Sequence, residues 1–65
     1  MENNTYRIML PGALPSERYL DMFGEFGLWS RALTFDSLSK ALNASSKTGL
    51  CTHVVDEDGN LQWNS

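Results

Sequence analysis

The sequence predicts a small α+β domain of two layers, in which two helices cover one face of a mainly antiparallel sheet. Alternating apolar side chains, which are typical of strands, occur near both ends of the chain. Two stretches between them repeat apolar residues every three or four positions, as amphipathic helices do. Glycines, prolines and helix-capping residues separate these stretches. The expected element order is β-α-β-α-β-β.

The N-terminal half is expected to hold a strand, a helix and a second strand. Residues 5–10 alternate as a strand does, and a Pro-Gly pair follows them. Pro15 suits the entry to a helix, and Gly24 is expected to end that helix because glycine weakens helices. Residues 28–33 could continue this helix or form a strand. Gly24 and Gly27 together favour the strand.

The second helix is expected to begin after residue 34. Thr34 and Asp36 can both cap its first turn, because a side-chain oxygen there accepts free backbone N–H groups. Lys40 lies four residues after Asp36, a spacing that brings opposite charges into contact on a helix. The polar stretch 43–48 is expected to fray. Gly49 can adopt the left-handed conformation that ends helices.

The last element is predicted to be a β-hairpin. Residues 50–55 contain threonine and valine and alternate in polarity, which favours a strand. Asp56 and Gly59 occupy the first and last positions that a type I turn prefers. A calcium loop is rejected for this acidic segment, because its first and twelfth ligand positions would fall on Val54 and Ser65.

Two registers of this hairpin are possible. With a left-handed glycine in a three-residue loop, Val55 lies opposite Leu61. The same register places His53 opposite Trp63 and puts these four side chains on one face. A two-residue loop would instead pair Val54 with Trp63. A slip of one residue reverses the face of every side chain, so the register decides what each face presents.

The length and the cysteine content limit which features can stabilise the fold. The 65 residues make a single compact domain, 1–65, with residues 1–4 expected to be loose. A core this small supplies little net stability without a disulfide, a metal or a partner subunit. One cysteine excludes an internal disulfide, and no Cys/His cluster suggests a structural metal. We therefore expect a homodimer.

The charge and hydropathy of the chain argue against two classes of partner. A net charge of −3 and a pI near 4.7 oppose binding to nucleic acid, which requires a basic face. No apolar run approaches the roughly 20 residues of a membrane span. The first residues do not resemble a signal peptide, and a lone cysteine suits a reducing compartment. We expect no membrane partner and a cytoplasmic location.

Cys51 and His53 are the residues closest to a reactive pair. They lie two apart on the expected strand and would share a face. A catalytic Cys/His pair also requires a third group that orients the base, and none is implied. The simpler interpretation is a small buried thiol and a half-buried imidazole. We therefore predict no enzyme activity and no catalytic, cofactor-binding or metal-binding residues.

The aromatic residues indicate an interaction surface. Seven of them, namely two Trp, two Tyr and three Phe, exceed what a thin two-layer core can cover. Phe23, Phe26 and Phe35 are expected in the core. The predicted interface consists of two indoles with a charged rim: Trp29, Trp63, Arg31, Asp56, Glu57 and Asp58.

These patterns together predict a small cytoplasmic protein–protein interaction module, a regulator or inhibitor that docks on a larger protein. One alternative is a small-ligand or metal-responsive protein, or a minor enzyme, that uses Cys51 and His53. Another is a nucleic-acid binder that stacks bases on sheet aromatics, which the negative net charge disfavours.

Overall fold

The computed structural model describes residues 5–64, and the side chains of residues 5–63. The expectation for residues 1–4 lies outside this range. The strands are β1 (Tyr6–Met9), β2 (Tyr19–Leu20), β3 (Phe26–Gly27), β4 (His53–Asp56) and β5 (Leu61–Asn64). The helical elements are the 3-10 helices η1 (Pro15–Glu17) and η2 (Trp29–Arg31) and the α-helix α1 (Leu38–Thr48).

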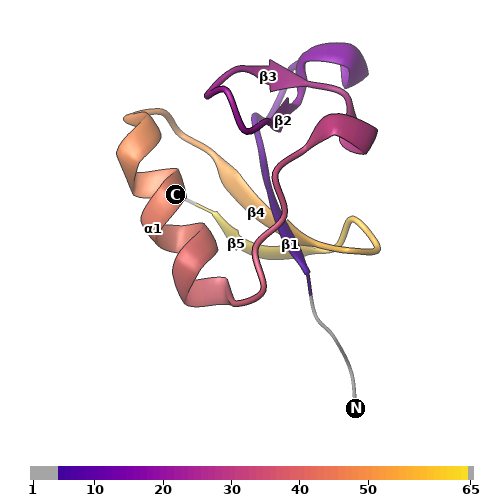
Figure 1. Ribbon diagram of the computed structural model, residues 1–65. Coiled ribbons are helices and arrows are strands. Elements are labelled where there is room, and N and C mark those ends of the chain that lie inside the picture. Colours follow the sequence, from indigo (N-terminus) through magenta and orange to yellow (C-terminus); the bar gives the residue numbers. More distant parts are fainter. Residues whose placement is uncertain (1–4, 65) are drawn as a thin grey trace.

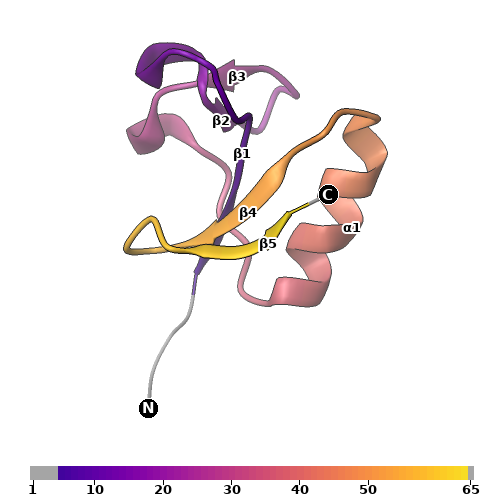
Figure 2. The ribbon, with the colours of Figure 1, turned by 180° about the vertical axis from the view of Figure 1, so that it is seen from behind.

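The strands form one five-stranded antiparallel sheet in the order β3-β2-β1-β4-β5 (Figure 1). The helix α1 covers one side of β1 and β4. The short elements β2, β3, η1 and η2 gather at the C-terminal end of β1, and the view from behind shows the same arrangement (Figure 2). The predicted α+β class and the mainly antiparallel sheet are confirmed.

The predicted helix over residues 15–24 is wrong. Only the single turn η1 forms, and the chain then pairs as two short strands, with Met9 opposite Tyr19 and Leu20 opposite Phe26. The apolar spacing that suggested a helix fits this hairpin equally well. The turn between the two strands is stabilised by side-chain hydrogen bonds that compete with helix formation. The structure therefore has one longer helix in residues 5–64, where two were predicted.

Residues 28–33 do not form the predicted strand. The turn η2 occupies their centre. The chain then becomes extended, and Ala32 forms an isolated bridge with Asp21. A second bridge joins Tyr6 and Phe35 through two backbone hydrogen bonds of 2.9 Å. These contacts join the segment after η2 to Asp21 and the segment before α1 to β1.

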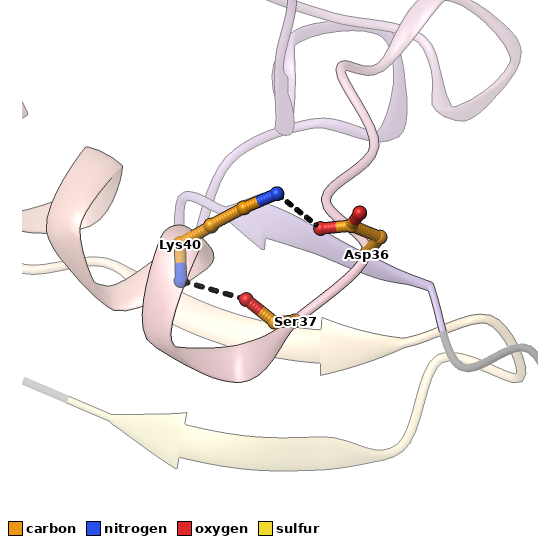
Figure 3. Close-up of polar contacts among 3 residues, drawn as sticks. All are labelled: Asp36, Ser37 and Lys40. Atoms are coloured by element: carbon orange, nitrogen blue, oxygen red, sulfur yellow. Dashed lines mark hydrogen bonds and ion pairs between the residues drawn. The ribbon is translucent and has the colours of Figure 1, made fainter.

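The N-terminus of α1 is capped by Ser37, not by the predicted Thr34 or Asp36. The hydroxyl of Ser37 accepts a hydrogen bond from the backbone N–H of Lys40 at 3.2 Å (Figure 3). The carboxylate of Asp36 instead forms the predicted ion pair with Lys40, at 2.9 Å. Gly49 ends the helix with φ of 71°, as expected.

The C-terminal part of α1 does not fray as predicted. The helix continues to Thr48. Ser45 is buried on its inner side and shares a hydrogen bond with the buried hydroxyl of Thr52, just before β4. This contact joins the C-terminal part of α1 to the segment before β4 through two buried hydroxyl groups.

The Asp36–Lys40 pair gives a prediction about pH. The hydrogen bond from the Lys40 ammonium lowers the pKa of Asp36, and the positive charge of Lys40 lowers it further. A lowered carboxyl pKa contributes stability above the pKa of the unfolded chain, and this stability is lost as pH falls through the folded value. We expect Lys40→Gln to raise the pKa of Asp36 in an NMR titration. Because both groups are exposed, 1 M salt should weaken the effect; identical titration curves in the two proteins would contradict the pairing.

The turn between β4 and β5 has the predicted conformation. Gly59 has φ of 83°, the N–H of Asp56 donates to Asn60 at 2.9 Å, and the N–H of Gly59 donates to Asp56 at 3.0 Å. Val55 lies opposite Leu61, which confirms the first of the two registers next to the turn.

The register changes one pair further along the hairpin. Val54 lies opposite Trp63, and His53 lies opposite Asn64. No residue of β4 is paired with Gln62 across the two strands. This is the pattern of a β-bulge, in which one strand carries one extra residue. The predicted pairing of His53 with Trp63 is therefore wrong. Because a shift of one residue reverses the face, Trp63 lies on the Val54 side of the sheet, away from Leu61.

The two faces of the sheet are covered by different elements. Ile8 and Val54 are paired neighbours, both are 0% exposed, and they pack on the side of α1, where Ala41 is also buried. On the other face, Arg7 and Val55 are paired, and the tryptophan of η2 lies against the Arg7 guanidinium. Val55 is only 2% exposed, so both faces contain buried residues.

Candidate interaction surface

The turn that joins β2 to β3 is well ordered. The Oδ1 atom of Asp21 accepts hydrogen bonds from the backbone N–H groups of Phe23 at 2.9 Å and Glu25 at 3.0 Å. The N–H of Asp21 donates to the carbonyl of Glu25 at 2.7 Å. Gly24 has φ of 78°, a conformation that L side chains rarely adopt. The backbone of this turn is therefore fixed by its own hydrogen bonds.

Two large apolar side chains extend from this turn into solvent. Met22 is 71% exposed and Phe23 is 72% exposed. We call these two residues the apolar tip. The prediction that Phe23 lies in the core is wrong, because the turn directs its side chain outward. Phe26 and Phe35 are half-buried, which fits the prediction only in part.

A depression of about 360 Å³ adjoins the apolar tip. Its lining combines apolar groups with charges of both signs: Ser16, Asp21, Phe23, Glu25, Phe26, Gly27, Leu28 and Arg31. Leu28 is 49% exposed here. The predicted interface residue Arg31 is exposed and lies in this depression with Phe23, so the structure places one predicted residue beside the apolar tip.

The same turn geometry occurs a second time, between β4 and β5. Asp56 Oδ1 accepts hydrogen bonds from the N–H groups of Asp58 and Asn60, both at 2.9 Å. These bonds span two and four residues, as those of Asp21 do. The sequences Asp-Met-Phe-Gly (21–24) and Asp-Glu-Asp-Gly (56–59) therefore form one turn motif. We call Glu57 and Asp58 the acidic tip.

Asp56 stabilises this turn and is not part of the charged rim that was predicted for the interface. Its second carboxylate oxygen accepts a hydrogen bond from Gln62 Nε2 at 3.0 Å, in addition to the two backbone bonds of the first oxygen. Glu57 and Asp58 are exposed, and in the part of the chain that the structure describes their carboxylates have no hydrogen-bond or ion-pair partner. The acidic tip is therefore open to solvent.

Trp29 lies beside the acidic tip. It is half-buried, its ring packs edge to face with Tyr19 at 4.9 Å between centroids, and the Arg7 guanidinium lies 3.9 Å from its ring centroid. A depression of about 350 Å³ is lined by two aromatic residues and by the turn: Tyr19, Trp29, Glu57, Asp58 and Gly59. The structure thus brings together three predicted interface residues.

Trp63 does not belong to this group. It is half-buried on the opposite face of the sheet, next to Val54. The two indoles therefore lie on different faces, and one flat partner surface cannot cover both.

Cys51 and His53 differ in exposure and in their place in the fold. Cys51 is exposed and precedes β4, so it is neither buried nor on the strand as predicted. His53 is half-buried at the start of β4. Within the described residues, no group of three or more His, Cys, Asp or Glu side chains could hold a metal ion. No helix in residues 5–64 is both long and apolar enough to cross a membrane.

Sequence reasoning missed the apolar tip, although a signal was present. The Asp and Gly at the first and last positions of 21–24 match those of 56–59, where the same pattern predicts a turn. The surrounding apolar spacing outweighed this signal. No protein-family model, no curated protein and no solved structure shows a significant match to the chain.

Proposed function

We propose that this protein is a small interaction module that docks on a larger protein through its apolar tip. The observation that supports this most strongly is the exposure of Met22 and Phe23 on a hydrogen-bonded turn. Large exposed apolar side chains that stand together are a feature of interaction sites. Methionine and phenylalanine are also enriched in protein interfaces.

The order of the turn strengthens this proposal. A loop that must be fixed upon binding loses conformational entropy, and this loss reduces affinity. The bonds from Asp21 and the left-handed Gly24 already fix the backbone around Phe23. The apolar tip can therefore enter a partner's pocket with little further ordering, as an anchor residue does. Leu28 and Arg31 would contact the rim of that pocket.

A regulator or inhibitor is the role that we assign to this docking. In this role the protein would cover a surface of its target. The exposed thiol of Cys51 is compatible with the reducing cytoplasm, where we place the interaction.

A photo-crosslinking amino acid at position 23 tests the docking site. Expressed in the source cell, this variant should crosslink to one specific protein. The same group at position 14, where Leu14 is 66% exposed, serves as a matched control and should not crosslink to that protein. Equal crosslinking from both positions, or none from position 23, would contradict docking through the apolar tip.

A double substitution of the apolar tip separates docking from folding. Met22→Glu together with Phe23→Asp converts residues 21–24 into the sequence that already forms the turn at 56–59. We expect the free energy of unfolding to change by no more than about 0.5 kcal/mol, because both side chains are exposed. The crosslinked partner should no longer bind. Urea unfolding and a binding assay measure the two effects separately.

Light scattering on the same variant addresses the predicted homodimer. If the wild-type chain is dimeric and the double variant is monomeric, the partner at the apolar tip is a second copy of the chain and not a larger protein.

A further inference from the structure

The open depression between Trp29 and the acidic tip is lined by two kinds of side chain, aromatic and acidic. The aromatic rings of Tyr19 and Trp29 come from β2 and η2, and the carboxylates of Glu57 and Asp58 come from the β4–β5 turn. Figures 1 and 2 both show this turn and the magenta coil near residue 30 on the same side of the molecule. An aromatic surface beside free carboxylates is the chemistry that binds an organic cation.

The indole of Trp29 is already used in this way within the protein. The Arg7 guanidinium lies 3.9 Å from the ring centroid. This contact and the edge-to-face contact with Tyr19 hold the ring in place. Part of the ring that Arg7 and Tyr19 leave uncovered borders the depression.

The charges around the depression favour a cation. Glu57 and Asp58 carry two negative charges without an ion-pair partner among the described residues, whose single ion pair joins Lys40 to Asp36. Asp56 adds a third negative charge at the base of the turn. Arg7 offsets one of these charges through its position on Trp29. The local balance remains negative, as does the net charge of −3 for the whole chain.

We propose that this depression binds a lysine or arginine side chain of the protein on which the module docks. The proposal rests on the proposed function for the existence of such a protein, but it concerns a different site from the apolar tip. The cation would lie against the exposed part of the Tyr19 and Trp29 rings with its N–H groups toward Glu57 and Asp58. The apolar tip would then enter an apolar pocket of the partner, and the acidic tip would contact a basic side chain of the same partner.

Short peptides test this site without the partner. Acetyl-Gly-Arg-Gly-amide and acetyl-Gly-Lys-Gly-amide are titrated into the ¹⁵N-labelled protein at low salt, with the uncharged citrulline peptide as a matched control. We expect saturable shifts of the Trp29 indole N–H and the Gly59 amide for at least one cationic peptide, with a Kd on the order of millimolar. The citrulline peptide should cause no saturable shift. Equal shifts from the charged and uncharged peptides would overturn the proposal.

Two variants locate the binding. Glu57→Gln with Asp58→Asn removes both charges but keeps the shape of the acidic tip, and should weaken cation binding by about fivefold or more. An apolar-tip variant that adds no charge, Met22→Ser with Phe23→Ser, should bind the peptides as the wild type does. Unchanged affinity in the acidic-tip variant would overturn the cation site. If the apolar-tip variant still binds the partner, the proposed function fails while the cation site can stand. If the wild type docks on its partner but shows no saturable peptide binding, the cation site alone fails.

Discussion

Replacing Ile8 by alanine is expected to leave a large fraction of the protein unfolded at 25 °C. Ile8 is 0% exposed in the central strand β1 and packs between the sheet and α1, next to Val54 and Ala41. Removing this much of a buried side chain costs about 2–5 kcal/mol. A domain of this size has a net stability of only about 3–5 kcal/mol. The substitution therefore removes most or all of the free energy of unfolding.

Urea unfolding followed by circular dichroism measures this effect. Ile8→Val removes a single methylene and should cost about 0.5–1.5 kcal/mol, so this variant stays folded and gives a measurable midpoint. Leu14→Ala is the surface control, since Leu14 is 66% exposed, and should shift the midpoint very little. A cooperative transition for Ile8→Ala at the wild-type midpoint would show that the core is not centred on β1.

Asp56→Ala is expected to destabilise the protein by about 2 kcal/mol. The carboxylate accepts three hydrogen bonds, from the N–H groups of Asp58 and Asn60 and from Gln62 Nε2, at 2.9, 2.9 and 3.0 Å. Each such bond contributes about 0.5–1.5 kcal/mol net. Their loss should release the edge strand β5, because the turn no longer holds the two strands together.

The neighbouring residue provides the control for this experiment. Glu57→Ala removes a charge from the same turn, but that carboxylate makes no hydrogen bond in the described part of the chain. Its unfolding midpoint in urea should stay close to wild type. Asp56→Asn keeps an acceptor for the backbone bonds and should fall between the two. Equal midpoints for Asp56→Ala and Glu57→Ala would contradict the role assigned to Asp56.

The parts of the fold that local signals determine could be predicted from the sequence. The first strand, the left-handed Gly49 and the turn at 56–59 all follow from short-range residue preferences. The helix predicted over 15–24 failed because its apolar spacing suits both a helix and a hairpin. Pairing of β2 with β1, a contact between distant residues, decided between the two.

The interaction surface was harder to predict than the fold. The β-bulge at Gln62 determines which face carries Trp63, and nothing in the local sequence indicates the bulge. The error over 15–24 also placed Phe23 in the core, which concealed the apolar tip. By contrast, the grouping of Trp29 with Glu57 and Asp58 follows from the position of η2 over the second face of the sheet.

Docking through the apolar tip is tested most directly by measuring how tightly the crosslinked partner binds the wild type and two variants. Isothermal titration compares the wild type with the Met22→Glu, Phe23→Asp double variant, and with Leu14→Ser as a surface control. An anchor residue typically contributes 2 kcal/mol or more, so we expect the Kd of the double variant to rise by about 30-fold or more. The control should bind as the wild type does. A folded double variant with an unchanged Kd would contradict the account.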